Sequence, residues 1–200
     1  EAIKVHLYNG AVVIFENLFL NKNLLIEMIT VICGTNRPSN ETQIFAKHFM
    51  NVLAEKQQHA KYLGLENLPL DFAFNNAVFG VENLILENIV DEFIVPAEKL
   101  IFISPEYNGS YPGVLKAFLD SFFPKQIAGK KAALVGVSSG RAGNLRGMDH
   151  LTGVLNYLKV TVLPNKLPIS RIYKLVKDNK IEDEATKKTI EQQLNELIDF

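Results

Sequence analysis

Cysteine is almost absent from this chain, because Cys33 is the single one among its 200 residues. One thiol excludes an internal disulfide, and it excludes iron–sulfur or structural zinc sites that need several cysteine ligands. Cys33 ends a β-branched run, where a free cysteine usually packs as a small apolar side chain. A lone free cysteine is typical of a reducing compartment, so we expect a cytoplasmic protein.

Net charge and long apolar runs are lacking as well. The formal net charge is -1, which gives no electrostatic reason to expect nucleic acid or an anionic membrane as partner. No uninterrupted apolar run approaches the length of roughly 18 residues that a membrane-spanning helix needs. The sequence start also lacks the basic region and small-residue cleavage site of a signal peptide. The composition is that of an ordinary globular chain of about one domain.

Residues 1–27 are the part of the sequence with the weakest pattern. A β-rich apolar run surrounds Asn9-Gly10, a pair that favours the type I′ turn of a hairpin. We therefore expect an N-terminal extension over residues 1–27, whose structure the sequence leaves open, followed by one compact domain over residues 28–200.

The compact domain is organised around residues 29–42. A β-branched run ends at Gly34, passes through small polar residues and opens into a segment with helical spacing of apolar residues. This order predicts a buried strand, a tight loop and a helix start. The residues expected on the core face of that helix are Phe45, Phe49, Val52 and Leu53.

The loop in this stretch has the composition of a phosphate site. A helix start offers free backbone N–H groups and the positive end of the helix dipole. Neither the glycine spacing of a dinucleotide fingerprint nor the Gly-Lys-Ser/Thr ending of a P-loop is present, which favours a single phosphate monoester. The alternative is an ordinary turn in which Ser39 or Asn40 only caps the helix. The polar residues are Thr35, Asn36, Arg37, Ser39, Asn40 and Thr42.

Strand and helix patterns alternate about five times along the domain. Further strands are predicted within residues 62–70 and at residues 100–103, 132–137 and 160–163. Helices are predicted around residues 81–93, 112–122, 148–158 and 182–198. This alternation predicts an α/β fold, a doubly wound five-stranded parallel sheet with helices on both faces. Ligands bind such sheets outside the carboxyl ends of the strands, where three polar loops are expected, at residues 34–42, 104–111 and 138–143.

Three motifs stand at these strand ends. They are Gly34-Thr35-Asn36-Arg37-Pro38 with Thr42, Pro105-Glu106-Tyr107-Asn108-Gly109-Ser110, and Ser138-Ser139-Gly140-Arg141-Ala142-Gly143. In residues and order they resemble the NAD(P)H-dependent FMN reductase family over residues 29–163, and the Pro-Glu-Tyr-Asn run is the most specific part. The resemblance implies a flavodoxin-like fold and a flavoprotein that binds FMN. The family includes flavin, quinone, azo-dye and chromate reductases.

The resemblance also implies which residues contact FMN. The first loop would hold the phosphate through Thr35, Arg37, Asn40 and Thr42. The second loop would lie against the isoalloxazine and ribityl groups through Pro105, Glu106, Tyr107, Asn108 and Gly109. The third loop would contact the other side of the ring and help to admit the nicotinamide through Ser138, Ser139, Gly140 and Gly143. NADPH is the expected donor, with NADH possible, because Arg37 and Arg141 can pair with a 2′-phosphate.

The residue pattern agrees with chemistry carried by a cofactor, so no catalytic side chain and no metal site are expected. The four histidines are scattered, and Glu106 in a Pro-Glu-Tyr turn is more typical of a loop-bracing or interface group. Tyr107 and Tyr111 suit either stacking on flavin or covering a partner subunit.

We expect an oxidoreductase that passes hydride from NAD(P)H to FMN and on to a small acceptor, namely a quinone, a flavin, an azo compound or a metal oxyanion. The alternative is a flavodoxin-like electron carrier or a regulatory module without turnover. The resemblance, together with Phe118, Phe122 and Phe123 near the second loop, predicts a homodimer or homotetramer.

Overall fold

A computed structural model describes residues 5–8, 11–14, 27–75, 82–121 and 123–200. Its main sheet is parallel throughout, with the strand order β4-β3-β5-β6-β7. A further short strand, β8, also pairs with β6, so β7 and β8 share the fifth position of the sheet. The strands are β3 (Met28–Cys33), β4 (His59–Gly64), β5 (Ala97–Pro105), β6 (Lys131–Val137), β7 (Thr161–Val162) and β8 (Leu167–Ile169).

The sheet winds in two directions from β3, as predicted. Strand β4 lies on one side of β3, and β5 and β6 lie on the other. All six residues of β3 are buried, which explains why it reads as a continuous β-branched and apolar run instead of an alternating one. The change of direction between β3 and β5 brings the predicted first and second loops to one edge of the sheet.

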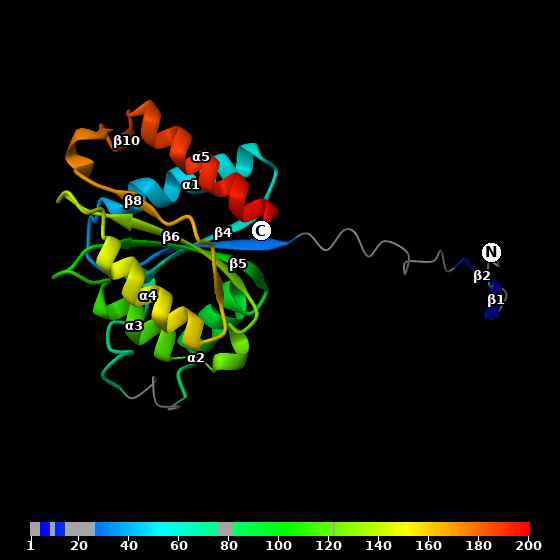
Figure 1. The fold of residues 1–200 in the computed structure, drawn as a ribbon. Helices are drawn as coiled ribbons and strands as arrows, with labels where there is room; N and C mark the ends of the chain where they lie inside the picture. Colours follow the sequence, from blue (N-terminus) through cyan, green and yellow to red (C-terminus); the bar gives the residue numbers. More distant parts are fainter. Residues whose placement is uncertain (1–4, 9–10, 15–26, 76–81, 122) are drawn as a thin grey trace.

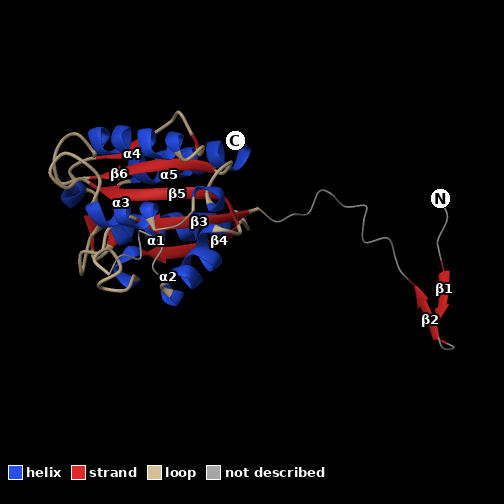
Figure 2. Cartoon of the chain, turned by 90° about the horizontal axis from the view of Figure 1, so that it is seen from below, coloured by secondary structure: helices blue, strands red, loops and turns tan. Residues whose placement is uncertain are grey.

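Helices cover both faces of the sheet (Figure 1 and Figure 2). On one face lie α1 (Thr42–Glu55) and α5 (Glu184–Asp199), which pack against β3, β5 and β6 through one apolar cluster. On the other face lie α2 (Leu84–Ile89), α3 (Gly113–Asp120) and α4 (Leu145–Tyr157), which share a second cluster. The predicted core positions of α1, Phe45, Phe49, Val52 and Leu53, are all buried.

Several element boundaries differ from the sequence prediction. Strand β4 begins before the predicted segment 62–70, and α2 continues as a π-helix over Val90–Ile94. The predicted strand at residues 160–163 is short, because Pro164 follows it and cannot donate to a ladder.

A small hairpin of β9 (Val176–Lys177) and β10 (Lys180–Ile181) was not predicted. Its turn residues Asp178 and Asn179 both have positive φ, of 49° and 58°.

In the N-terminal segment, β1 (Val5–Tyr8) and β2 (Ala11–Ile14) pair antiparallel, which agrees with the predicted hairpin. The predicted turn at Asn9-Gly10 lies outside the described residues. Within the described residues, no helix has the length and apolar character to cross a membrane.

Candidate functional site

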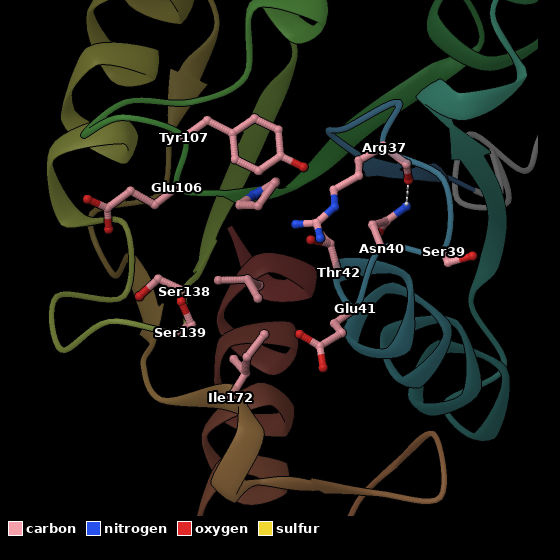
Figure 3. Close-up of a pocket in the computed structure, with 12 residues that line it drawn as sticks. Arg37, Ser39, Asn40, Glu41, Thr42, Glu106, Tyr107, Ser138, Ser139 and Ile172 are labelled. Carbon is pink, nitrogen blue, oxygen red and sulfur yellow. Dashed lines mark hydrogen bonds between the residues drawn. The ribbon is translucent and has the colours of Figure 1, made fainter.

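The three predicted loops meet around one cavity of about 420 Å³ at the carboxyl ends of β3, β5 and β6 (Figure 3). The sequence-predicted residues that line it come from all three loops. They are Arg37, Ser39, Asn40, Thr42, Pro105, Glu106, Tyr107, Ser138 and Ser139. In the part of the chain that the structure describes, the other predicted residues do not line the cavity. They are Thr35, Asn108, Gly109, Gly140 and Gly143.

Asn40 braces the first loop from within. Its side-chain amide donates to the Arg37 carbonyl at 2.9 Å, the dashed bond in Figure 3. Its Oδ1 accepts from the backbone N–H of Gln43 at 3.0 Å and from the Cys33 thiol at 3.5 Å. The Asn40 side chain therefore caps the first turn of α1, as the alternative interpretation of this loop proposed.

The start of α1 presents unused donors beside that brace. Among the described residues, no hydrogen bond engages the backbone N–H groups of Asn40, Glu41 and Thr42. These groups add to the positive end of the helix dipole, and the exposed Arg37 side chain lines the same region. This end of the cavity suits an anionic group.

The second loop is a miniature hairpin. Tyr107 and Ser110 exchange both backbone hydrogen bonds, at 2.9 and 3.1 Å, around Asn108 and Gly109. Those two residues have φ of 51° and 79°, as a type I′ turn requires. Ser110 Oγ also lies 2.9 Å from Nδ1 of His150 on α4. Asn108 and Gly109 thus form the turn, and the turn holds Tyr107 at the cavity wall.

Ser138 shapes the third loop. Its hydroxyl accepts from the Gly143 N–H at 3.1 Å and donates to the Gly140 carbonyl at 3.2 Å. Gly143 has φ of 57°, and a side chain there would meet the Pro168 backbone at 2.7 Å. Gly143 therefore allows the loop to fold back on Ser138, which lines the cavity together with Ser139.

Sequence reasoning did not single out Asn144, which connects the second and third loops. This residue is fully buried, and its amide donates to the carbonyls of Ser104 and Pro105, each at 3.0 Å. Neighbouring glycines make room for it: a side chain at Gly147 would come within 2.0 Å of its Oδ1. The small residues around Asn144 were the sequence feature that could have indicated its buried position.

Three further residues at the cavity were not predicted to face a ligand, namely Glu41, Val137 and Ile172. Ile172 begins the 3-10 helix Ile172–Lys174 and is carried to the third loop by backbone bonds from Arg171 to Gly140 and from Ile172 to Ser138. Nothing in its sequence neighbourhood marks it. In Figure 3 the Glu106 carboxylate points away from Tyr107 and Arg37, although Glu106 lines the cavity.

Solved structures with the same fold include an NAD(P)H:(acceptor) oxidoreductase from Paracoccus denitrificans. It has a TM-score of 0.71 and 22% identity, and the match covers 87% of this chain and 96% of that one. Flavodoxin 1 from Bacillus cereus aligns with a TM-score of 0.55 and 16% identity over 86% of this chain and 97% of that one. These likenesses establish a flavodoxin-like fold, as predicted.

Among curated proteins, an NAD(P)H-dependent FMN reductase of Pseudomonas aeruginosa is 38% identical over 111 residues, which are 53% of this chain and 60% of that protein. A 2-hydroxy-1,4-benzoquinone reductase of a Burkholderia species is 32% identical over 109 residues, or 48% of this chain and 60% of that protein. The match thus spans 60% of the length of each of these two relatives. The model of the family described as NADPH-dependent FMN reductase matches residues 28–174, and the chain therefore belongs to the NADPH-dependent FMN reductase family.

Proposed function

We propose that this protein binds one FMN per chain in the three-loop cavity and acts as an NAD(P)H-dependent oxidoreductase. The observation that carries the proposal is the cavity itself, which joins the unused N–H groups of α1 and Arg37 to the aromatic Tyr107. The chemistry that FMN supplies in such proteins is two-electron transfer from a reduced nicotinamide to a second acceptor.

The residues that line the cavity are chemically suited to FMN. The phosphate would be held by Arg37, Thr42 and the backbone N–H groups at the start of α1. Asn40 would support that site, because its amide is already bonded to the Arg37 carbonyl and to Gln43. Pro105, Glu106 and Tyr107 would lie along one side of the ring system, and Ser138 and Ser139 along the other. The volume of about 420 Å³ falls in the range of small-molecule sites.

The protein's own contribution is binding, orientation and charge. Arg37 and the α1 dipole would neutralise the phosphate, while Glu41 sets one negative charge against it at the cavity wall. The hairpin at Tyr107 and the brace at Ser138 keep both walls in place before a ligand arrives, which lowers the ordering cost of binding.

We propose NADPH as the preferred donor, with Arg37 or Arg141 pairing with its 2′-phosphate. The proposed acceptors are small quinones, flavins, azo compounds or metal oxyanions. The name of the Burkholderia relative supports quinones as acceptors. Azo compounds are supported by the name of an NADPH-azoreductase of Staphylococcus haemolyticus, which is 25% identical over 140 residues.

We further propose a cytoplasmic homodimer or homotetramer. Phe123 is 66% exposed and available for a subunit contact, whereas Phe118 is fully buried in the core. Phe122 lies outside the described residues. Light scattering at micromolar concentration tests this proposal, and a monomer would contradict it.

A visible spectrum of the purified protein, with identification of any released chromophore, tests the cofactor. A preparation that is colourless and takes up no added FMN would refute both the cofactor and the enzyme. Aerobic NADPH consumption by the FMN-loaded protein then separates an enzyme from an electron carrier or a regulatory module, because only the enzyme turns over without a protein partner.

A further inference from the structure

A hydrogen bond links the first loop directly to the second. Thr35 Oγ1 and the Tyr107 hydroxyl lie 2.9 Å apart, although the two residues are separated by 72 positions in the sequence. Thr35 is fully buried behind the first loop, and Tyr107 lines the cavity. Figure 3 shows the Tyr107 hydroxyl directed towards the side of the cavity where Arg37 lies.

The Thr35 hydroxyl has a second partner within its own loop. It accepts from the backbone N–H of Arg37 at 3.2 Å. The backbone of Thr35 is itself fixed, because its N–H donates to the Cys33 carbonyl at 2.9 Å. One buried hydroxyl therefore sets the position of Arg37 on the anion side and of the Tyr107 ring on the aromatic side.

The hydrogen bond between Thr35 and Tyr107 has a specific role, because other bonds already hold the backbone of Tyr107. The exchanged bonds with Ser110 fix the main chain, and the His150 contact of Ser110 ties the hairpin to α4. Only the side-chain torsions of Tyr107 remain to be fixed, and the contact with Thr35 restrains them at the far end of the ring. Loss of the hydroxyl at residue 35 would leave both the Arg37 N–H and the Tyr107 hydroxyl without this partner.

We propose that Thr35 is a positioning residue that couples the anion side of the cavity to its aromatic wall. Each side then favours the binding-competent arrangement of the other. The inference rests on the proposed function for its ligand, FMN, but the coupling is a property of the protein alone. In this proposal Thr35 supports the two sides of the cavity and does not make the direct phosphate contact that the family resemblance implied.

The test uses Thr35→Val, which keeps the shape and removes the hydroxyl, Thr35→Ser, which keeps the hydroxyl, Tyr107→Phe, and the Thr35→Val/Tyr107→Phe double variant. Thr189→Val serves as the matched control, because Thr189 lies exposed on α5 and its hydroxyl donates to the Thr186 carbonyl of the same helix. Hydrogen–deuterium exchange of the flavin-free proteins gives the first readout. Affinities for FMN and riboflavin give the second.

In the flavin-free protein, Thr35→Val and Tyr107→Phe should each speed exchange on the order of tenfold in both segments 34–42 and 105–111. The double variant should add little to either single change. Thr35→Ser and Thr189→Val should match the parent. Exchange that rises only in the segment carrying the substitution, or effects that multiply in the double variant, would overturn the proposal.

In binding, Tyr107→Phe should reduce the preference for FMN over riboflavin severalfold, although Tyr107 is not proposed to contact the phosphate. An unchanged preference would also overturn the coupling. If no variant and no parent protein binds FMN, the proposed function fails, while the exchange experiment still decides whether the two loops are coupled.

Discussion

The side chain of Asn144 and the carbonyl of Pro105 are joined by a 3.0 Å hydrogen bond that ties the start of α4 to the second loop of the cavity. Asn144 is in the left-handed conformation, with φ of 61°, and its amide also donates to the Ser104 carbonyl. Asparagine tolerates this backbone conformation better than most residues do. One buried side chain thus serves two carbonyls at the end of β5.

Asn144→Ala should lower the free energy of unfolding by about 2–3 kcal/mol, because two buried carbonyls lose their donor. Asn144→Gly should lower it by somewhat less, since glycine relieves the strain of the positive φ but restores no donor. Asn156→Ala, at an exposed position of the same helix, is the control and should be close to neutral. Urea unfolding monitored by circular dichroism measures all three, and parent-like stability of Asn144→Ala would contradict the assignment.

Two glycines should respond in opposite directions to alanine. A side chain at Gly136 in β6 would come within 2.0 Å of the Gly143 carbonyl oxygen, so Gly136→Ala should destabilise the protein by about 1–3 kcal/mol or more. Gly153 lies in α4 with no atom near the added carbon, so Gly153→Ala should stabilise by roughly 0.5–1 kcal/mol. Thermal unfolding of the two variants side by side checks this contrast, and a change of the same sign in both would contradict it.

Cys33 should be unreactive in the folded protein. Burial, helped by the charge of Glu66, raises the pKa of the thiol to about 12, so very little thiolate is present near neutral pH. Reaction with a disulfide reagent at about pH 8 should be on the order of a hundredfold slower in the native than in the guanidinium-unfolded protein. Immediate stoichiometric labelling of the native protein would show that the thiol is accessible.

His48 should make stability depend on mildly acidic pH. Among the described residues its Nε2 is buried without a hydrogen-bond partner, and burial, with Lys187 nearby, lowers the pKa of the imidazole below its usual 6.5. As pH falls through this range the unfolded chain binds the proton first, so the folded state loses stability. Glu55 and Glu184 oppose the shift in part.

His48→Gln should remove much of this dependence between about pH 7.5 and 5.5. His59→Gln, at an exposed position, should retain it. Urea midpoints at the two pH values provide the comparison. If the parent and His48→Gln lose stability in parallel on acidification, another group is responsible.

Arg37→Ala should erode the preference for FMN over riboflavin, which lacks the phosphate. Two charge-assisted contacts predict a preference of roughly a hundredfold in the parent protein, and removal of one should reduce it about tenfold. Riboflavin affinity should change little, and FMN affinity should weaken with added salt. Flavin fluorescence titration measures each affinity.

Arg141→Ala is the control for that experiment, because Arg141 is exposed and is not among the described residues that line the cavity. If Arg37 recruits NADPH instead, its loss will raise the KM for NADPH and leave the flavin preference intact. Equal parent affinities for FMN and riboflavin would rule out a phosphate site.

The sheet was predictable because buried parallel strands must be continuous apolar runs: residues 132–137 were predicted and Lys131–Val137 is observed. The topology alone was enough to predict that the three loops meet at one edge of the sheet. The short strands β8, β9 and β10 were missed, since strands of two or three residues carry no periodicity. Ile172 reaches the cavity only through the folded backbone around Ser138.

The roles of polar residues within the loops were harder to predict. Composition does not reveal whether Thr35 and Asn40 direct their hydrogen bonds inward or towards a ligand, and the structure shows inward bonds for both. For Asn108-Gly109 the signal was present, because this pair favours a type I′ turn. The family resemblance drew attention to flavin contact, and such a contact stays a prediction.

The contribution of Ile172 also bears on the order of events during synthesis. The cavity is walled by segments that leave the ribosome in succession, from Arg37 through Tyr107 and Ser138 to Ile172. A nascent chain that stops short of Ile172 has an incomplete wall and lacks the backbone bonds that Ile172 and Arg171 make to the third loop. We therefore expect the proposed FMN site to become complete only after Ile172 has been synthesised, late in the production of the chain.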